Sequence, residues 1–136
     1  MERDWQGRTA VITGAASGFG LEVCRIAARA RMNIVMADVQ PDALAHAARE
    51  LEAQGAAVLA QRCDVAQAAE VDALAAATFE RFGTPHFVFN NAGVAPGGLA
   101  WEHGPKDWAW AVGVNLYGVA NGVRAFTPAM LEAAAR

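Results

Sequence analysis

Three glycines follow a short apolar run near the start of the chain, at positions 14, 18 and 20. The run enters a turn, and a helical pattern begins directly behind it. This layout is typical of a seat for the phosphates of a dinucleotide, because N–H groups at the helix start face the negative charge. A plain tight turn is the alternative, but it needs fewer glycines. The predicted seat consists of Gly14, Ser17, Gly18, Phe19 and Gly20.

An acidic residue, Asp38, ends the second apolar run, 18 residues after Gly20. A carboxylate there can accept hydrogen bonds from both hydroxyls of an adenosine ribose, and it would repel a 2′-phosphate. Val39 stands where an arginine could have offset that repulsion, and Ser17 is not basic either. The residues therefore favour NAD over NADP. The alternative is that Asp38 is a solvated loop residue.

A second aspartate, Asp64, closes the third apolar run beside Cys63 and Val65. Its carboxylate could accept a hydrogen bond from the adenine amino group, with Val65 beside the base. It could equally cap the helix that follows. The sequence leaves both interpretations open.

The segment Asn90–Gly93 ends the fourth apolar run, at the sheet edge where ligands bind in parallel α/β proteins. Its small residues leave space for a cofactor, and its amides can tie neighbouring strand ends together. A turn without ligand contacts is the alternative. We predict cofactor contacts from Asn91, Ala92 and Gly93.

Asn115 is a polar residue among apolar neighbours in the predicted last helix. A polar side chain in such surroundings needs hydrogen-bond partners. Its amide could hold a water molecule in a proton path, or it could only satisfy nearby backbone groups. The residue itself does not decide between these roles.

Strand-like and helix-like segments alternate along the chain, which predicts right-handed crossovers and a parallel sheet. We expect a Rossmann-type doubly wound α/β fold with strand order 3-2-1-4, incomplete on its C-terminal side. Leu21, Ile26 and the alanines should lie on the inner face of the first helix. The expected strands are Thr9–Thr13, Asn33–Asp38, Ala56–Cys63 and His86–Asn90. The expected helices are Gly18–Ala30, Pro41 to Gly55, Gln67–Phe82, and Pro105 to about Ala135 with a kink before Pro128.

Composition narrows the class of protein. A length of 136 residues fits one domain, residues 1–136, with a real hydrophobic core. The net charge of −3 without a basic stripe argues against nucleic acid, and no apolar run approaches a membrane span. The start Met1–Trp5 has no apolar signal core, and two cysteines cannot build a disulfide framework, so we expect a cytoplasmic protein. The three histidines share no metal-ligand spacing, and we expect no metal.

Together these residues resemble the short-chain dehydrogenase/reductase family. The run from Thr13 to Gly20 is similar to its cofactor motif, and the segment Asn90–Gly93 is similar to its motif after the fourth strand. The resemblance implies that Asp38 selects NAD, that Asp64 contacts adenine, and that Asn115 belongs to a catalytic tetrad. It implies an NAD-dependent oxidoreductase that moves a hydride between an alcohol or ketone and nicotinamide.

The chain departs from the family pattern in one respect. The family places a serine and then a Tyr-x-x-x-Lys pair after the next strand, with tyrosine as the general acid or base. The only tyrosine here is Tyr117 and the only lysine is Lys106, so no such pair can be drawn. We therefore expect the N-terminal half of a longer enzyme. The alternative is a catalytically inactive dinucleotide-binding module, and a third is a phosphate-binding α/β protein of another kind.

Apolar residues surround much of the predicted last helix. The resemblance implies that this helix packs in a homodimer or homotetramer, and we expect the chain alone to be poorly soluble or to pair with another copy. Trp101, Trp108 and Trp110 precede and enter this helix. They could wall a substrate pocket or pack in a core or interface, and the substrate itself is not specified.

Overall fold

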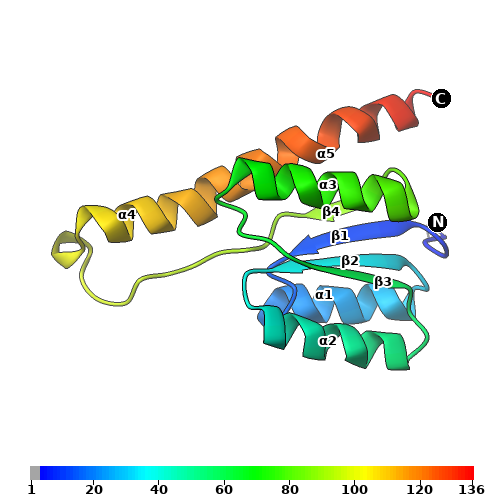
Figure 1. The fold of residues 1–136 in the computed structure, drawn as a ribbon, viewed down its shortest axis with the longest axis horizontal. Helices are drawn as coiled ribbons and strands as arrows, with labels where there is room; N and C mark the ends of the chain where they lie inside the picture. The colour runs from blue at the N-terminus through cyan, green and yellow to red at the C-terminus, as the bar shows by residue number, and fades with distance from the viewer. Residues whose placement is uncertain (1–3) are drawn as a thin grey trace.

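The computed structural model describes residues 4–136. The segment Met1–Trp5, predicted to have no apolar signal core, therefore lies partly outside the described residues. The centre of the fold is a parallel four-stranded sheet of order β3-β2-β1-β4, which confirms the predicted topology (Figure 1). Each strand pairs in parallel with its neighbour. The strands are β1 (Thr9–Thr13), β2 (Asn33–Asp38), β3 (Val58–Arg62) and β4 (Phe87–Phe89).

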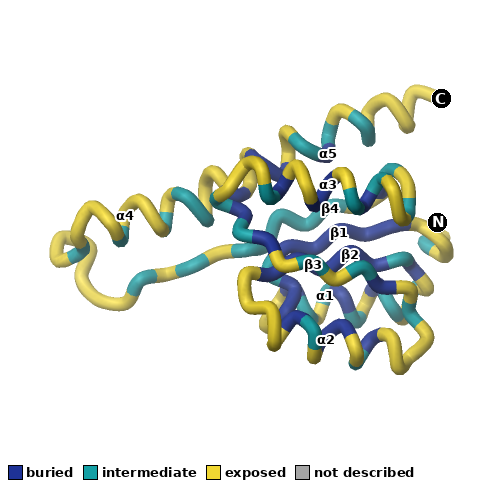
Figure 2. The backbone as a smooth tube through the Cα atoms, viewed as in Figure 1, coloured by how far each residue is buried: buried dark blue, intermediate teal, exposed yellow. Residues whose placement is uncertain are grey.

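Helices cover both faces of the sheet (Figure 1). Helices α1 (Gly18–Arg29) and α2 (Pro41–Ala53) pack on one face, and α3 (Ala68–Phe82) and α5 (Gly118–Ala134) pack on the other. Successive side chains of a strand point to opposite faces, so β1 and β2 must be apolar on both. Every residue of β1 is accordingly buried, and the two helical layers enclose separate core clusters (Figure 2).

Some predicted boundaries were too generous. The third strand was expected over Ala56–Cys63 and the fourth over His86–Asn90, and both are shorter in the structure. His86 still holds Thr9, because its main-chain N–H donates to the Thr9 carbonyl and its Nδ1 accepts the Thr9 N–H. The expected inward position of Ile26 was wrong. Ile26 is 52% exposed, whereas Leu21 packs against the core cluster and the buried residues of α1 are Gly20, Cys24 and the predicted alanine Ala27.

The last predicted helix is divided in the structure. Helix α4 (Pro105–Val112) leads into a π-helical segment, Gly113–Tyr117, and then into α5. Helix α5 continues on both sides of Pro128, so the kink expected before this residue stays a prediction, and an irregular π-helical turn lies earlier. A short 3₁₀ turn, Ala100–Glu102, precedes α4. Helix α4 extends beyond the sheet and is largely exposed (Figure 2).

Candidate functional site

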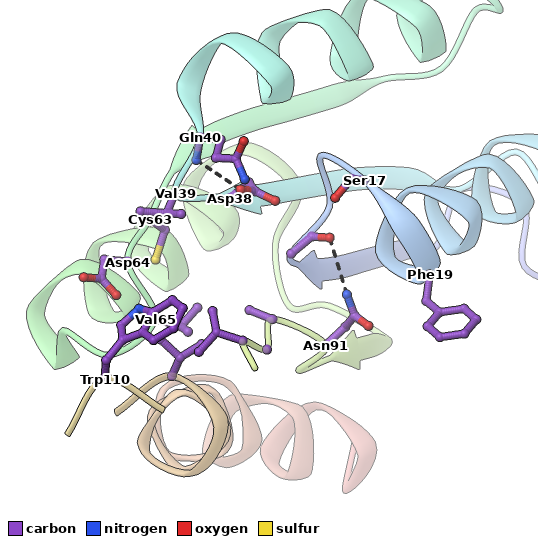
Figure 3. A pocket seen from close by; sticks show the side chains of 15 residues that line it. Ser17, Phe19, Asp38, Val39, Gln40, Cys63, Asp64, Val65, Asn91 and Trp110 are labelled. Atoms are coloured by element: carbon purple, nitrogen blue, oxygen red, sulfur yellow. Dashed lines mark hydrogen bonds between the residues drawn. The ribbon is translucent and has the colours of Figure 1, made fainter. Parts of the chain in front are cut away.

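A cavity of about 500 Å³ lies where the strands end and their loops begin. Parallel α/β sheets bind ligands at this carboxyl edge, and the volume is in the range of small-molecule sites. Figure 3 shows its walls coming from the glycine turn, the loops after β2, β3 and β4, and the helix that carries Trp110. The lining residues are Gly14, Ser17, Phe19, Asp38, Val39, Gln40, Cys63, Asp64, Val65, Asn91, Ala92, Gly93, Val94, Trp110 and Val114.

The glycine turn depends on backbone conformations that other residues avoid. Gly14 has a φ of 63° and Gly18 a φ of 58°, both in the left-handed region. A Cβ on Gly14 would also lie 2.9 Å from the Ala92 Cα, and one on Gly20 would overlap the Gly14 carbonyl oxygen. A Cβ on Gly18 would meet no other atom within 4 Å, so that side of the turn is open. The turn is therefore tightly packed at Gly14 and Gly20 and accessible at Gly18.

Asp38 is buried at the end of β2 and its carboxylate helps to build the turn. Its Oδ2 accepts the Ala16 N–H at 3.0 Å, and its Oδ1 accepts the Gln40 N–H at 3.0 Å. A carboxylate offers about four acceptor positions. Two are used by these backbone groups, so others remain on a side chain that lines the cavity. The alternative of a freely solvated loop aspartate does not fit this burial.

Thr13 and Asn91 join the ends of β1 and β4. The Thr13 hydroxyl oxygen accepts the N–H groups of Asn91 and Ala92, each at 3.0 Å. The Asn91 side chain returns a bond, because its Nδ2 donates to the Thr13 carbonyl at 3.0 Å. The same Nδ2 also lies 3.4 Å from the Gly14 carbonyl oxygen (Figure 3). These bonds fix the segment after β4 against the glycine turn. The Asn91 amide therefore ties the strand ends together, as the sequence predicted, whereas the buried Oδ1 of Asn90 has no hydrogen-bond partner.

We expect Thr13→Val to destabilise the protein by about 1–3 kcal/mol, because the half-buried Ala92 N–H loses its acceptor and the Asn91 N–H keeps only the Phe89 carbonyl. Urea unfolding measures this change. Thr78→Val is the matched control. The buried Thr78 hydroxyl only donates to the Leu74 carbonyl within α3, so its loss strands no N–H group and should cost about 1 kcal/mol or less. Equal losses for the two variants would contradict this role of Thr13.

Asp64 lies beside the cavity and braces the loop between β3 and α3. Its Oδ1 accepts the Ala66 N–H at 3.0 Å, and its own N–H donates to Glu70 Oε1 at 3.0 Å. Glu70 also pairs with Arg62. The Asp64 side chain therefore stabilises the turn before α3. It does not cap that helix, because the N-cap residue of α3 is Gln67. The adenine contact stays a prediction.

Cys63 lines the same cavity but is 2% exposed. Burial raises the pKa of the thiol to about 11, helped by the nearby carboxylates of Glu70 and Asp64. The thiol is therefore protonated at neutral pH and lacks the thiolate that a nucleophile needs. Cys63 acts here as a packing residue.

Asn115 lies in the π-helical segment, and its side chain pairs with the backbone of Val94. The Asn115 Oδ1 accepts the Val94 N–H, and its Nδ2 donates to the Val94 carbonyl, both at 2.8 Å. The pair joins the loop after β4 to the last helical layer, next to Gly93. One of the two roles considered from sequence, satisfying backbone groups, is thus visible. The catalytic role stays a prediction.

The cavity brings together ten of the thirteen predicted site residues. Gly18 and Gly20 belong to the turn beneath it, and Asn115 lines a neighbouring shallow hollow with Asn90 and Val119. Five further residues line the cavity that the sequence pattern did not predict there, namely Gln40, Cys63, Val94, Trp110 and Val114. The sequence could have linked Trp110 with Val114. The two residues are four positions apart in a predicted helix, and such positions lie on the same side of it. Trp101 is more exposed than Trp110, at 80% against 48%.

The parallel sheet of order 3-2-1-4, with helices on both faces and a glycine turn after β1, defines a Rossmann-type α/β fold. The chain belongs to the short chain dehydrogenase family, whose family model matches residues 8–135. It is 42% identical over 129 residues to the 1-deoxy-11-beta-hydroxypentalenate dehydrogenase of Streptomyces exfoliatus, covering 93% of this chain and 47% of that protein.

Solved structures give the same result. A short chain dehydrogenase/reductase from Burkholderia phymatum in complex with NAD shares 49% identity and a TM-score of 0.94, over 97% of this chain and 47% of that one. A metagenomic short-chain oxidoreductase in complex with NADP shares 30% identity and a TM-score of 0.90, over 96% and 60%. Related structures thus hold either cofactor. The chain spans about half the length of the curated relatives it matches.

Within residues 4–136, no three His, Cys, Asp or Glu side chains gather in an arrangement that could hold a metal ion. No helix of this described part combines the length and the apolar character needed to cross a membrane.

Proposed function

We propose that this chain is the cofactor-binding part of an NAD-dependent dehydrogenase that acts on an alcohol or ketone. The observation that carries the proposal is the Asp38 carboxylate. It is held by two backbone N–H groups, faces the cavity and keeps acceptor positions for ribose hydroxyls. Its negative charge disfavours the 2′-phosphate of NADP, and the neighbouring Val39 offers no positive charge in return.

The described residues fit NAD in shape and in chemistry. Gly14 and Gly18 expose backbone at the N-terminus of α1, where amide groups attract phosphate. Asp38 would hold the adenosine ribose, and Asp64 and Val65 would lie near the base. Asn91, Ala92 and Gly93 would line the path toward the nicotinamide side. NAD, when bound, supplies the hydride acceptor of the reaction.

The proton chemistry requires groups that residues 1–136 do not contain in the family pattern, since no Tyr-x-x-x-Lys occurs. In our proposal Asn115 supports a proton path while its side chain keeps the Val94 loop in place. A dinucleotide-binding module without catalysis is the second candidate, because the glycine turn and the Asp38 carboxylate at the cavity can bind a dinucleotide without any catalytic group. The two proposals share the cofactor site and differ only in turnover.

The test is an activity assay of the natively encoded protein with NAD and a panel of alcohols, followed by NADH fluorescence. We expect turnover with NAD that exceeds turnover with NADP. Tight NAD binding without any turnover across the panel, and no Tyr-x-x-x-Lys in the encoded polypeptide, would favour the binding module. Failure to bind either dinucleotide would overturn both.

We also propose that the protein forms a homodimer or homotetramer through its last helical layer. Exposed apolar side chains follow one another at helical spacing on this layer, namely Val112, Leu116, Val119 and Val123. We call them the apolar stripe. A second copy would remove this surface from water.

Placing a charge in the apolar stripe should break the assembly. We expect Val123→Asp to shift the molar mass measured by light scattering from an oligomer to a monomer, because burying an unpaired carboxylate is costly. Ile26→Asp is the matched control, since Ile26 is equally exposed, at 52% against 49%, but lies on α1 in the opposite layer. A wild-type monomer, or dissociation by both variants, would contradict the proposed interface.

A further inference from the structure

Trp110 lies at one end of the cofactor cavity and has no role in the function proposed so far. It reaches the cavity from α4 and remains 48% exposed. Figure 3 shows its indole beside Val65 and below Asp64, on the side away from Ser17 and Phe19. A large aromatic surface is therefore half uncovered at a ligand-sized cavity.

The sheet order tells which part of a dinucleotide would reach this end. The glycine turn follows β1, Asp38 ends β2, and Asp64 follows β3, the next strand outward. Adjacent strands lie about 4.8 Å apart, so the step from β1 to β3 is roughly 10 Å. A nucleotide with its phosphates at the turn and its ribose at Asp38 therefore points its base toward Asp64, Val65 and Trp110.

The helix that carries Trp110 is anchored so that this side chain faces the cavity. Trp110 and Val114 line it, four residues apart. Four residues further on, Gly118 packs so tightly on Val65 that a Cβ would lie 2.6 Å from Val65 Cγ2. The π-helical segment Gly113–Tyr117 spans the step from Val114 to Gly118. A π-helix has more residues per turn than an α-helix, so these two positions stay on the same side of the helix. Trp110 is thereby placed above the end of β3.

Trp108 provides an internal comparison. It stands two residues from Trp110 on the same helix, so the two indoles face nearly opposite sides. Trp108 is 55% exposed and lines a separate hollow with His103 and Asp107, away from the cofactor cavity. The two tryptophans have similar exposure and lie on the same helix, but their surroundings differ. Of the two, only Trp110 lines the cofactor cavity.

We infer that Trp110 is the aromatic wall of the adenine site, and that its indole stacks on the base. The inference rests on the proposed dinucleotide function and adds a residue that binds the base. Adenine presents a π-face, and every base can stack on an aromatic side chain in this way. Val39 and Val65 supply the apolar surroundings, and Asp64 lies within the same end of the cavity.

Equilibrium binding of AMP, nicotinamide mononucleotide and NAD to the natively encoded protein tests this role. We expect Trp110→Ala to weaken AMP and NAD about 10- to 100-fold while leaving nicotinamide mononucleotide unchanged. Trp110→Phe should restore most of the affinity, because it keeps an aromatic face. Trp108→Ala, the matched control, should bind all three ligands as the wild type does.

Fluorescence gives a second readout that does not depend on turnover. AMP should quench the emission of the wild type, and Trp110→Phe should lose that quenching although it still binds AMP. Wild-type AMP affinity in Trp110→Ala, or an equal loss in Trp108→Ala, would overturn the inference and leave the proposed function intact. A wild type that binds neither NAD nor NADP would overturn the proposed function and this inference together.

Discussion

Gly20→Ala is expected to destabilise the protein by about 3 kcal/mol, the upper end of overpacking costs, and to weaken NAD binding by at least about tenfold. A Cβ at this position would overlap the Gly14 carbonyl oxygen and lie 2.7 Å from the Asn91 Nδ2. The first obstacle is backbone, and the second is a side-chain amide held by its bond to the Thr13 carbonyl, so the glycine turn itself has to move. Because the same turn is the predicted phosphate seat, stability and binding should fall together. Urea unfolding and calorimetric titration with NAD measure the two effects.

The matched control is Gly97→Ala. Gly97 lies in the loop after β4, and a Cβ there would meet no atom within 4 Å. Its φ is not in the left-handed region. This variant should therefore retain wild-type stability and NAD affinity. An unchanged unfolding midpoint for Gly20→Ala would show that the turn is not as closely packed as described.

The second large effect concerns cofactor choice. We expect the double variant Asp38→Ala with Val39→Arg to shift the ratio of NADP to NAD affinity by about 100-fold or more in favour of NADP. The change removes hydrogen bonds from a charged acceptor, worth about 1.5–3 kcal/mol, and places a cation beside the 2′-phosphate. Titration with each dinucleotide measures the ratio.

The double variant also removes the bond from the Ala16 N–H to Asp38, so its stability should fall as well. Asp38→Asn separates the two effects, because its amide oxygen can still accept one backbone N–H while the charge is lost. This variant should lose discrimination between the cofactors with a smaller loss of stability. Asp42→Ala, an exposed carboxylate at the start of α2, is the control for net charge. An unaltered preference in the double variant would exclude Asp38 as the selecting residue.

The strand order and the position of the glycine turn could be predicted because local signals carry them. Apolar runs without alternation indicate strands buried on both faces, and β1 and β2 are such strands. The inner face of α3 also follows helical spacing in the sequence, since Val71, Leu74 and Thr78 recur three and four residues apart and are buried. The boundaries of β3 and β4 are less certain from sequence, because an outer strand pairs on one side only.

Other features depend on packing that the pattern does not contain. Residue size determined which face of α1 packs on the sheet. The small residues Gly20 and Cys24 are buried there, and the larger Ile26 is exposed. The π-helical turn at Asn115 depends on contacts with the Val94 loop, which periodicity cannot show. The bonds of Asp38 to the turn likewise join positions 22 residues apart. Sequence therefore indicated which residues form the site, and packing determined how they are held.

The most direct measurement is a crystal structure of the natively encoded protein grown with NAD. The account predicts diphosphate oxygens on the backbone amides of the turn from Gly14 to Gly20, with both ribose hydroxyls on Asp38. Density for the dinucleotide elsewhere on the molecule, or no density at saturating NAD, would contradict it.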